Sequence, residues 1–284
     1  MDSAVEKSSG TPYPSGSAPF ETLPPEVAEI IFKMAMSNEV PWRHNFLVDV
    51  IAKVSTRFKY LAALKSLWQG EVDIRGDSEY VKQVTQKFLN KGTSRLTFEG
   101  TYIETPTFTD DLLIVAAKCE KLEQLKLCTL IIMSWPTFTV PWVSLKELYL
   151  QLVTMNANTF LDVQLHQSLP NLEKFCILNC HSIPESDQSW GIILPDMVGC
   201  HFLRKVMLTG SVFQMDGLPP TLSTLGGSKS LINNIDIDSL EEYFDHCVIS
   251  DDIKFPVNTA GQKLAVLLRI ECWRKKHGLE ILSP

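Results

Sequence analysis

The chain has 284 residues, of which 45% are hydrophobic, and its formal net charge is −7. The length allows about two domains, and the mildly acidic balance argues against general nucleic-acid binding, for which a basic stripe is expected. No apolar run reaches the ~18 residues that a membrane span needs. The seven cysteines are scattered and no Asn-x-Ser/Thr sequon occurs. We therefore expect a protein of a reducing compartment, in the cytoplasm, the nucleus or both.

The first segment, residues 1–19, is rich in Pro, Ser, Gly and Thr and has no apolar centre. This composition predicts a disordered tail and is unlike a signal peptide.

Residues 20–70 carry three helical patterns. In the first two, apolar residues recur at the spacing of one helical face: Val27, Ile30, Ile31 and Met34, then Leu47, Val50, Ile51 and Val54. A third helix is expected from about Thr56 to Lys65. Three helices in about fifty residues make a small core, which is marginal alone and is expected to lean on a partner. An ordinary three-helix bundle without a special role is the simpler alternative.

The same segment resembles an F-box in its residue pattern. The matching positions are Leu23, Pro24, Glu26, Ile31, Phe32, Val54, Ser55, Arg57, Phe58, Leu67 and Trp68. Two departures from the family are a long stretch between residues 37 and 45 and the pair Ala35-Met36. The resemblance implies docking to a Skp-type adaptor, and through it to a cullin. It assigns the adaptor-binding and core apolar set to Leu23, Pro24, Ile31, Val54, Phe58 and Trp68.

Residues 71–92 are expected to form a linker helix. Asp77 or Ser78 is placed to cap it. Its apolar positions are Tyr80, Val81, Val84 and Phe88, and Gly92 is its expected stop.

Residues 93–284 are organised by repetition of an L-x-x-L-x-L pattern. Its first leucines are Leu122, Leu145, Leu172 and Leu203, with weaker copies at Leu96 and Leu222. These spacings agree with a leucine-rich repeat, whose period is roughly 20–29 residues. Each copy predicts a strand with alternate side chains inward. The inward set is Leu125, Leu127, Leu148, Leu150, Phe175, Ile177, Val206 and Leu208.

The segments between the predicted strands suit helices on the other side of the repeats. We expect one helix from Thr109 to about Cys119 and another from Asn158 or Thr159 to Leu165. Near the end of the sequence, a helix over residues 264–276 is placed to close the stack. The predicted fold class is thus a small three-helix F-box followed by a short leucine-rich-repeat solenoid with a C-terminal capping helix.

A search for catalytic chemistry gives little. Cys180-His181, Cys200-His201 and His246-Cys247 pair the right residue types, but sequence neighbours point apart on a strand. No motif supplies a third group, no CxxC exists, and Cys176 with Cys180 alone is not a zinc site. We expect no catalytic residues, metal or cofactor.

The resemblance to an F-box, joined to the repeats, implies a non-catalytic substrate receptor of an SCF-type ubiquitin ligase, which would hold a protein substrate close to the ubiquitin-charged enzyme. One alternative is a repeat scaffold that binds a partner without any role in ubiquitination. A hydrolase using a Cys-His pair is weaker. We expect no nucleic-acid or membrane partner.

The substrate site is placed by strand alternation. The residue between two inward leucines must face the opposite, concave side. This column holds Thr97, Lys126, Tyr149, Cys176 and Met207, and the next holds Glu99, Cys128, Gln151, Leu178 and Thr209. The predicted substrate-binding residues are Lys126, Tyr149, Cys176, Leu178 and Met207. A loop or tail of the chain that covers this patch is the alternative.

Overall fold

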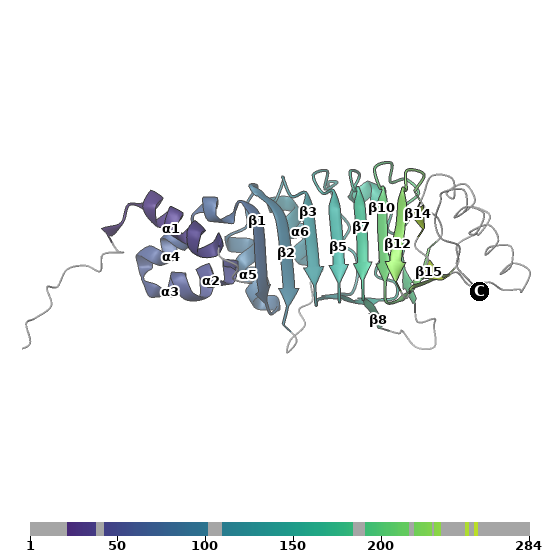
Figure 1. The fold of residues 1–284 in the computed structure, drawn as a ribbon, viewed down its shortest axis with the longest axis horizontal. Helices are drawn as coiled ribbons and strands as arrows, with labels where there is room; N and C mark the ends of the chain where they lie inside the picture. Colours follow the sequence, from purple (N-terminus) through teal and green to yellow (C-terminus); the bar gives the residue numbers. More distant parts are fainter. Residues whose placement is uncertain are drawn as a thin grey trace, which may run out of the picture.

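The structure, a computed structural model, is built around one parallel sheet (Figure 1). It describes residues 22–37, 43–101, 110–183, 191–215, 219–228, 230–233, 248–249 and 253–254. The expected tail at residues 1–19 and the expected capping helix at residues 264–276 lie outside the described residues.

The main sheet has the order β1-β2-β3-β5-β7-β10-β12-β14, and every pair in it is parallel. Its strands are β1 (Gly70–Gly76), β2 (Thr93–Gly100), β3 (Gln124–Cys128), β5 (Glu147–Gln151), β7 (Lys174–Leu178), β10 (Lys205–Thr209), β12 (Thr224–Ser228) and β14 (Val248–Ile249).

Two smaller sheets are formed by the segments that leave these strands. One has the order β4-β6-β8, and the other β15-β13-β11-β9. Their strands are β4 (Ile131–Ile132), β6 (Thr154–Asn156), β8 (His181–Ile183), β9 (Gly191–Ile193), β11 (Val212–Gln214), β13 (Ser230–Asn233) and β15 (Ile253–Lys254).

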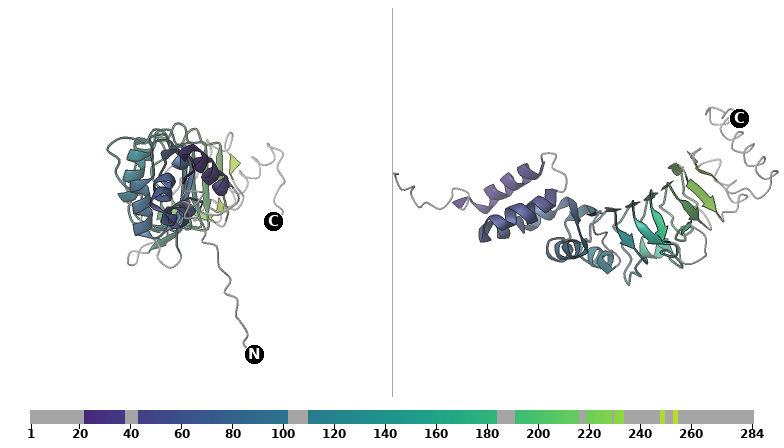
Figure 2. Two further views of the ribbon diagram at one scale, coloured as in Figure 1. Left: turned by 90° about the vertical axis from the view of Figure 1, so that its left-hand side faces the viewer. Right: turned by 90° about the horizontal axis from the view of Figure 1, so that it is seen from below.

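The core lies on one side of the main sheet. All eight residues predicted to point inward, from Leu125 to Leu208, have no exposed side-chain surface, so that prediction is confirmed. On the same side pack α5 (Ser78–Lys87) and α6 (Asp110–Lys118), whose buried residues include Val81, Val84, Leu112 and Val115. These helices lie behind the sheet in Figure 1 and on one side of it in Figure 2. The opposite face carries no described helix.

A common turn follows four successive strands of the main sheet. Thr129, Leu152, Asn179 and Gly210 occupy the same position after β3, β5, β7 and β10, and each has a φ between 51° and 75°. The backbone N–H groups of the first three donate to the neighbouring strand's carbonyl at 2.8–3.0 Å, which continues the ladder by one residue.

The N-terminal helical segment is built from short pieces. They are α1 (Pro25–Ser37), α2 (Arg43–Phe46), the π-helix η2 (Leu47–Ile51), α3 (Ala52–Val54), α4 (Thr56–Ala62) and the 3₁₀-helix η3 (Lys65–Trp68). Ser55 caps α4 by accepting a hydrogen bond from the Phe58 N–H, and Asp77 caps α5 through the Tyr80 N–H as predicted.

The predicted fold class is wrong. In place of a three-helix F-box followed by a leucine-rich-repeat solenoid with a capping helix, the described chain has an α/β-like architecture, with a parallel main sheet and few helices. Its sheet begins within the expected linker helix, because residues 70–76 form β1. In β1, buried Val72 and Ile74 alternate with charged residues, a period of two that favours a strand over a helix.

Two further helical predictions also need correction. Residues 157–162 are turns, and only the one-turn helix α7 (Leu165–Ser168) follows them, so the helix expected from Asn158 to Leu165 does not form. In α1, the buried residues are Ala28, Phe32 and Met36, while Ile31 is half-buried and the rest of the predicted face is exposed. The helix is apolar on two sides, so its periodicity did not determine which side is buried.

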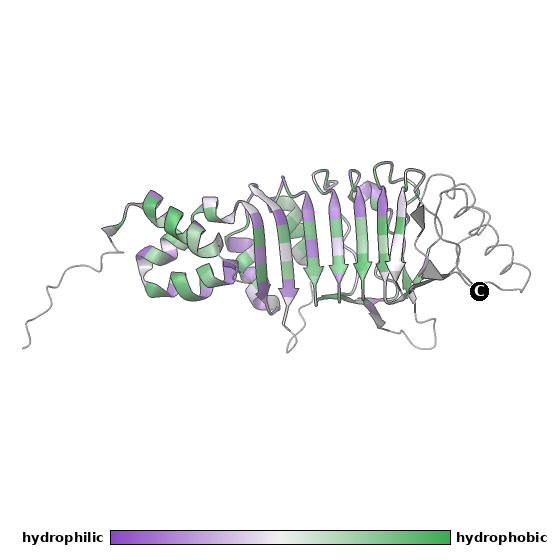
Figure 3. Cartoon of the chain, in the orientation of Figure 1, coloured by the Kyte–Doolittle hydropathy of each residue, from purple (hydrophilic) through white to green (hydrophobic). Residues whose placement is uncertain are grey.

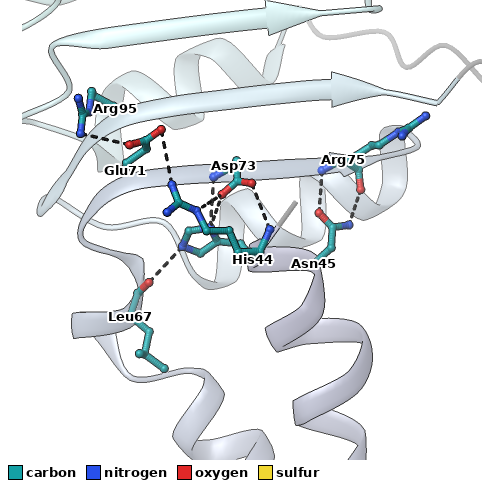
Figure 4. Close-up of polar contacts among 8 residues, drawn as sticks. His44, Asn45, Leu67, Glu71, Asp73, Arg75 and Arg95 are labelled. Atoms are coloured by element: carbon teal, nitrogen blue, oxygen red, sulfur yellow. Dashed lines mark hydrogen bonds and ion pairs between the residues drawn. The ribbon is translucent and has the colours of Figure 1, made fainter. Parts of the chain in front are cut away.

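The helical segment covers the edge of the sheet at β1, as Figure 4 shows. The Asn45 side chain donates to the Arg75 carbonyl at 2.5 Å and accepts from the Arg75 N–H at 2.8 Å, as a neighbouring strand would. One residue earlier, buried His44 contacts Asp73 Oδ1 at 3.0 Å through Nδ1 and the Leu67 carbonyl at 3.1 Å through Nε2. The Arg75 N–H, the Arg75 carbonyl and the Asp73 N–H of the edge strand therefore find partners within the chain.

The same junction carries ion pairs. Arg43 contacts Asp73 at 3.1 Å and Glu71 at 3.5 Å, and Arg95 contacts Glu71 at 3.1 Å.

At the same junction, Trp68 is fully buried, stacks on Phe88 with ring centres 4.6 Å apart and donates a hydrogen bond to the Ala62 carbonyl. A single hydrophobic core therefore runs from α1 into the sheet.

Candidate protein-binding surfaces

The first candidate surface is the outer face of α1. Val27, Ile30 and Met34 lie on one face of this helix and are 40%, 58% and 63% exposed. They lie on the side of α1 that faces away from the buried residues Ala28, Phe32 and Met36. Exposed apolar residues that line up on one helix face are typical of an interaction site.

A second exposed apolar stripe lies on η2 and α3. Val50 and Val54 are one helical turn apart and are 49% and 61% exposed, whereas Leu47, earlier in η2, is fully buried. Hydrophobic bands on both helical stretches are visible in Figure 3. We call these residues, Val27, Ile30, Met34, Val50 and Val54, the helical apolar stripes.

The residues assigned to adaptor binding fall into two groups. Pro24 and Val54 are exposed and Leu23 is half-buried, so these three are accessible to a partner. The Leu23 carbonyl accepts a hydrogen bond from Arg57, which fixes the chain entering α1 to α4. The other three belong to the packing: Ile31 and Phe58 lie against the core, and Trp68 is fully buried within it.

The second candidate surface is the open face of the main sheet. Its register aligns side chains into three rows that cross the strands. From β3 to β10, the first row is Gln124, Glu147, Lys174 and Lys205, the second Lys126, Tyr149, Cys176 and Met207, and the third Cys128, Gln151, Leu178 and Thr209. We call this area the open-face patch.

Tyr149 organises the centre of the open-face patch. Its hydroxyl donates to Glu147 at 2.5 Å and accepts from the Lys174 ammonium at 2.6 Å. The same ammonium lies 4.7 Å from the centre of the tyrosine ring. Burial and the hydrogen bond to Glu147 raise the pKa of Tyr149, and the hydrogen bond with Tyr149 raises that of Lys174. The phenol is therefore neutral and the lysine charged near neutral pH.

The structure brings the predicted substrate-binding residues onto this face but does not expose them equally. Lys126, Tyr149, Leu178 and Met207 are half-buried, while Cys176 is 2% exposed. The sulfur of Met207 lies over Gly226, where a Cβ atom would come within 2.2 Å of it. The patch is therefore less apolar and more charged than its sequence columns suggested.

Sequence reasoning missed the first row of this patch. Lys174 and Lys205 stand one residue before the inward Phe175 and Val206, so the same alternation sends them outward. The predicted columns begin after the first inward residue of each strand. Applying the period of two in both directions would have found Glu147, Lys174 and Lys205.

The described cysteines are poorly suited to nucleophilic chemistry. Burial raises the pKa of Cys180 and Cys200 to about 12 and that of Cys119, Cys128 and Cys176 to about 11, which disfavours the reactive thiolate. The pair His246-Cys247 lies outside the described residues.

The described ranges contain neither a cluster of metal-binding side chains nor a membrane-spanning helix. There, no three His, Cys, Asp or Glu side chains gather as a metal site would require. Nor does any helix of this part of the chain combine the length and apolar character needed to cross a membrane.

Comparisons with known proteins add no relative. No protein-family model matches the sequence, and neither the curated proteins nor the solved structures give a significant match. The resemblance to an F-box therefore depends on the residues quoted for it.

Proposed function

We propose that this chain is the non-catalytic substrate receptor of an SCF-type ubiquitin ligase. The N-terminal helical segment would bind a Skp-type adaptor, and through it a cullin, while the open face of the sheet would hold the protein to be ubiquitinated. Such a protein acts through proximity, because a held substrate meets the charged enzyme at high effective concentration. Its place would be the cytoplasm, the nucleus or both.

The observation that carries the proposal is the pair of helical apolar stripes. They lie in the segment with the F-box-like residues, and two of the assigned adaptor-binding positions, Pro24 and Val54, are exposed beside or within them. The five large apolar side chains of these stripes are 40–63% exposed, which is typical of a surface that a partner covers. A partner that covers them would gain roughly 25 cal/mol for each Å² of apolar surface buried.

The test is co-purification with a Skp-type adaptor from cells. We expect Ile30→Lys with Val54→Lys to abolish adaptor recovery while the melting temperature stays unchanged, because both side chains are exposed. The matched control is Val140→Lys with Val198→Lys, which changes two exposed valines outside the helical segment and should leave recovery intact. Full recovery of adaptor by the first variant would contradict the proposal. If the wild-type chain recovers no adaptor but does recover other partners, the scaffold without a role in ubiquitination is favoured.

A further inference from the structure

The open-face patch contains a like-charged pair that the fold does not require. Lys174 and Lys205 stand directly opposite each other on the adjacent strands β7 and β10. Strands lie about 4.8 Å apart, and like charges at such a position destabilise a sheet. On a chain with a net charge of −7, a lysine pair left facing the solvent calls for a compensating role.

The described part of the chain neutralises this pair only in part. The nearest acidic member of the same row, Glu147, is occupied by the Tyr149 hydroxyl and by the Gln124 amide at 3.3 Å. Lys174 donates one hydrogen bond to Tyr149, and an ammonium has three donors. Among the described carboxylates, none forms an ion pair with Lys205, whereas Lys126 interacts electrostatically with Glu99 on the adjacent strand.

The charges at the other end of the same face are arranged differently. There, Arg95 pairs with Glu71, Arg75 with Glu99 at 3.7 Å, and Arg43 with Asp73. The least compensated positive charge on this face is therefore that of Lys174 and Lys205, beside Tyr149. Complementary charge on a partner would give this area both orientation and a faster encounter.

We propose that the open-face patch binds an extended, anionic peptide segment of the partner protein. One carboxylate or phosphate of the segment lies between Lys174 and Lys205, and a second reaches Lys126. Lys126 lies two strands from Lys174 and one row across, about 10–12 Å away by sheet geometry. An extended chain covers this distance in three to four residues, so the segment carries its negative groups at that spacing. This inference rests on the proposed function for the role of the partner as substrate.

Tyr149 makes the site rigid before binding. Its hydroxyl and ring hold the Lys174 side chain in place, so less conformational entropy is lost when an anion binds. Met207 lies in the row next to the lysine pair and Leu178 in the row beyond it, and both supply half-buried apolar area for the residues between the two negative groups.

The inference is tested by fluorescence anisotropy with the full chain and labelled nonapeptides. One peptide has glutamate at positions 3 and 6, a second has phosphoserine there, and a third has glutamine. We expect both anionic peptides to bind, the glutamine peptide to bind about tenfold more weakly, and salt to reduce the difference. Tighter binding of the phosphoserine peptide would identify phosphate as the preferred group. Equal binding of all three peptides, or of none, would overturn the inference.

Variants locate the binding on the molecule. Lys174→Gln with Lys205→Gln should weaken binding of the glutamate peptide about tenfold. The matched control, Lys82→Gln with Lys121→Gln, removes the same charge at exposed positions outside the open face and should bind as the wild type does. Equal affinity of the two double variants would remove the site from this face. Lys205→Gln alone should melt no lower than the wild type, since it relieves repulsion.

Adaptor recovery separates this inference from the proposed function. A chain that binds anionic peptides but no adaptor supports the site and contradicts the ligase role. A chain that recovers the adaptor but does not discriminate among the peptides supports the ligase role and contradicts the peptide site.

Discussion

At the scale of single residues, the turn after each main-sheet strand imposes a backbone conformation that suits few side chains. Gly210 and Asn179 are the residue types that adopt positive φ most readily, whereas Leu152 is held there at 53°. Leu152 is 39% exposed, so packing compensates only in part for the unfavourable conformation. The repeat geometry, and not the residue, determines the backbone at this position.

We therefore expect Leu152→Asn to stabilise the protein by about 0.5–1 kcal/mol, because it relieves a left-handed leucine. Urea denaturation of the full chain measures the gain. Leu161→Asn is the control, since Leu161 is 53% exposed and is not among the described residues with positive φ. If both variants change the free energy of unfolding equally, the strain at Leu152 is negligible.

Asp73 makes stability depend on pH. Burial by itself would raise its pKa, but hydrogen bonds and charges from His44 and Arg43 outweigh burial and lower it below the ordinary 3.8. A carboxyl whose pKa is lower in the folded than in the unfolded protein stabilises the fold fully at pH values above its unfolded-state pKa. This contribution is lost as the pH falls through its folded-state pKa.

Asp73→Asn should therefore be less stable than the wild type at pH 7, and the difference should shrink as the pH falls below about 3.8. Unfolding by urea at pH 7, 4 and 2.5 gives the comparison. Glu173→Gln, at an exposed position, serves as the control for the lost charge. A difference that stays constant over this range would show that the ionised carboxylate of Asp73 is not what stabilises the junction.

At the scale of elements, secondary structure was predicted best where the apolar residues of a segment follow a single periodicity. The L-x-x-L-x-L copies placed β3, β5, β7 and β10 and their inward residues correctly, because large apolar residues recur at every second position over a single buried face. It failed where two patterns compete. The β1 segment is short and precedes a helix, and α1 is apolar on two sides, so local periodicity alone does not settle either one.

The candidate surfaces follow the same rule. Alternation placed Tyr149 and Met207 on the open face, but it gave no information on the depth of Cys176 or on the contacts of Glu147, Lys174 and Tyr149. Those depend on how side chains of neighbouring strands pack and on the register between strands, neither of which one repeat determines.

Leu148 in β5 tests the packing of one strand against its neighbours. It is fully buried between Leu125 and Phe175, so Leu148→Ala should cost about 2–5 kcal/mol. Leu161→Ala, at a position 53% exposed, should change stability by less than about 0.5 kcal/mol. Chemical denaturation of both variants measures these changes in the free energy of unfolding. A loss below about 1 kcal/mol for Leu148→Ala would mean that the neighbouring strands collapse into the space that the leucine side chain leaves.

At the scale of the whole molecule, the helical segment and the sheet share one core, and this bears on the expected division into residues 20–70, 71–92 and 93–284. The side chains of α2 occupy the edge of β1, and Trp68 lies between His44 and Phe88 with ring centres 4.9 and 4.6 Å away. A boundary at residue 70 would separate groups that are packed together. The proposed adaptor-binding and substrate-binding surfaces would then be held in a fixed relation by this junction.

Trp68→Ala tests that relation. Removing the fully buried indole should cost about 3–5 kcal/mol and leave His44 and Phe88 without their common neighbour. If the two parts form one cooperative unit, hydrogen exchange should increase in peptides of α4 and also in peptides of β1 and β2. Tyr60→Ala, at a position 69% exposed on α4, should alter neither set. Loss of protection confined to the helical peptides of the Trp68 variant would instead show two independent domains with a boundary near residue 70.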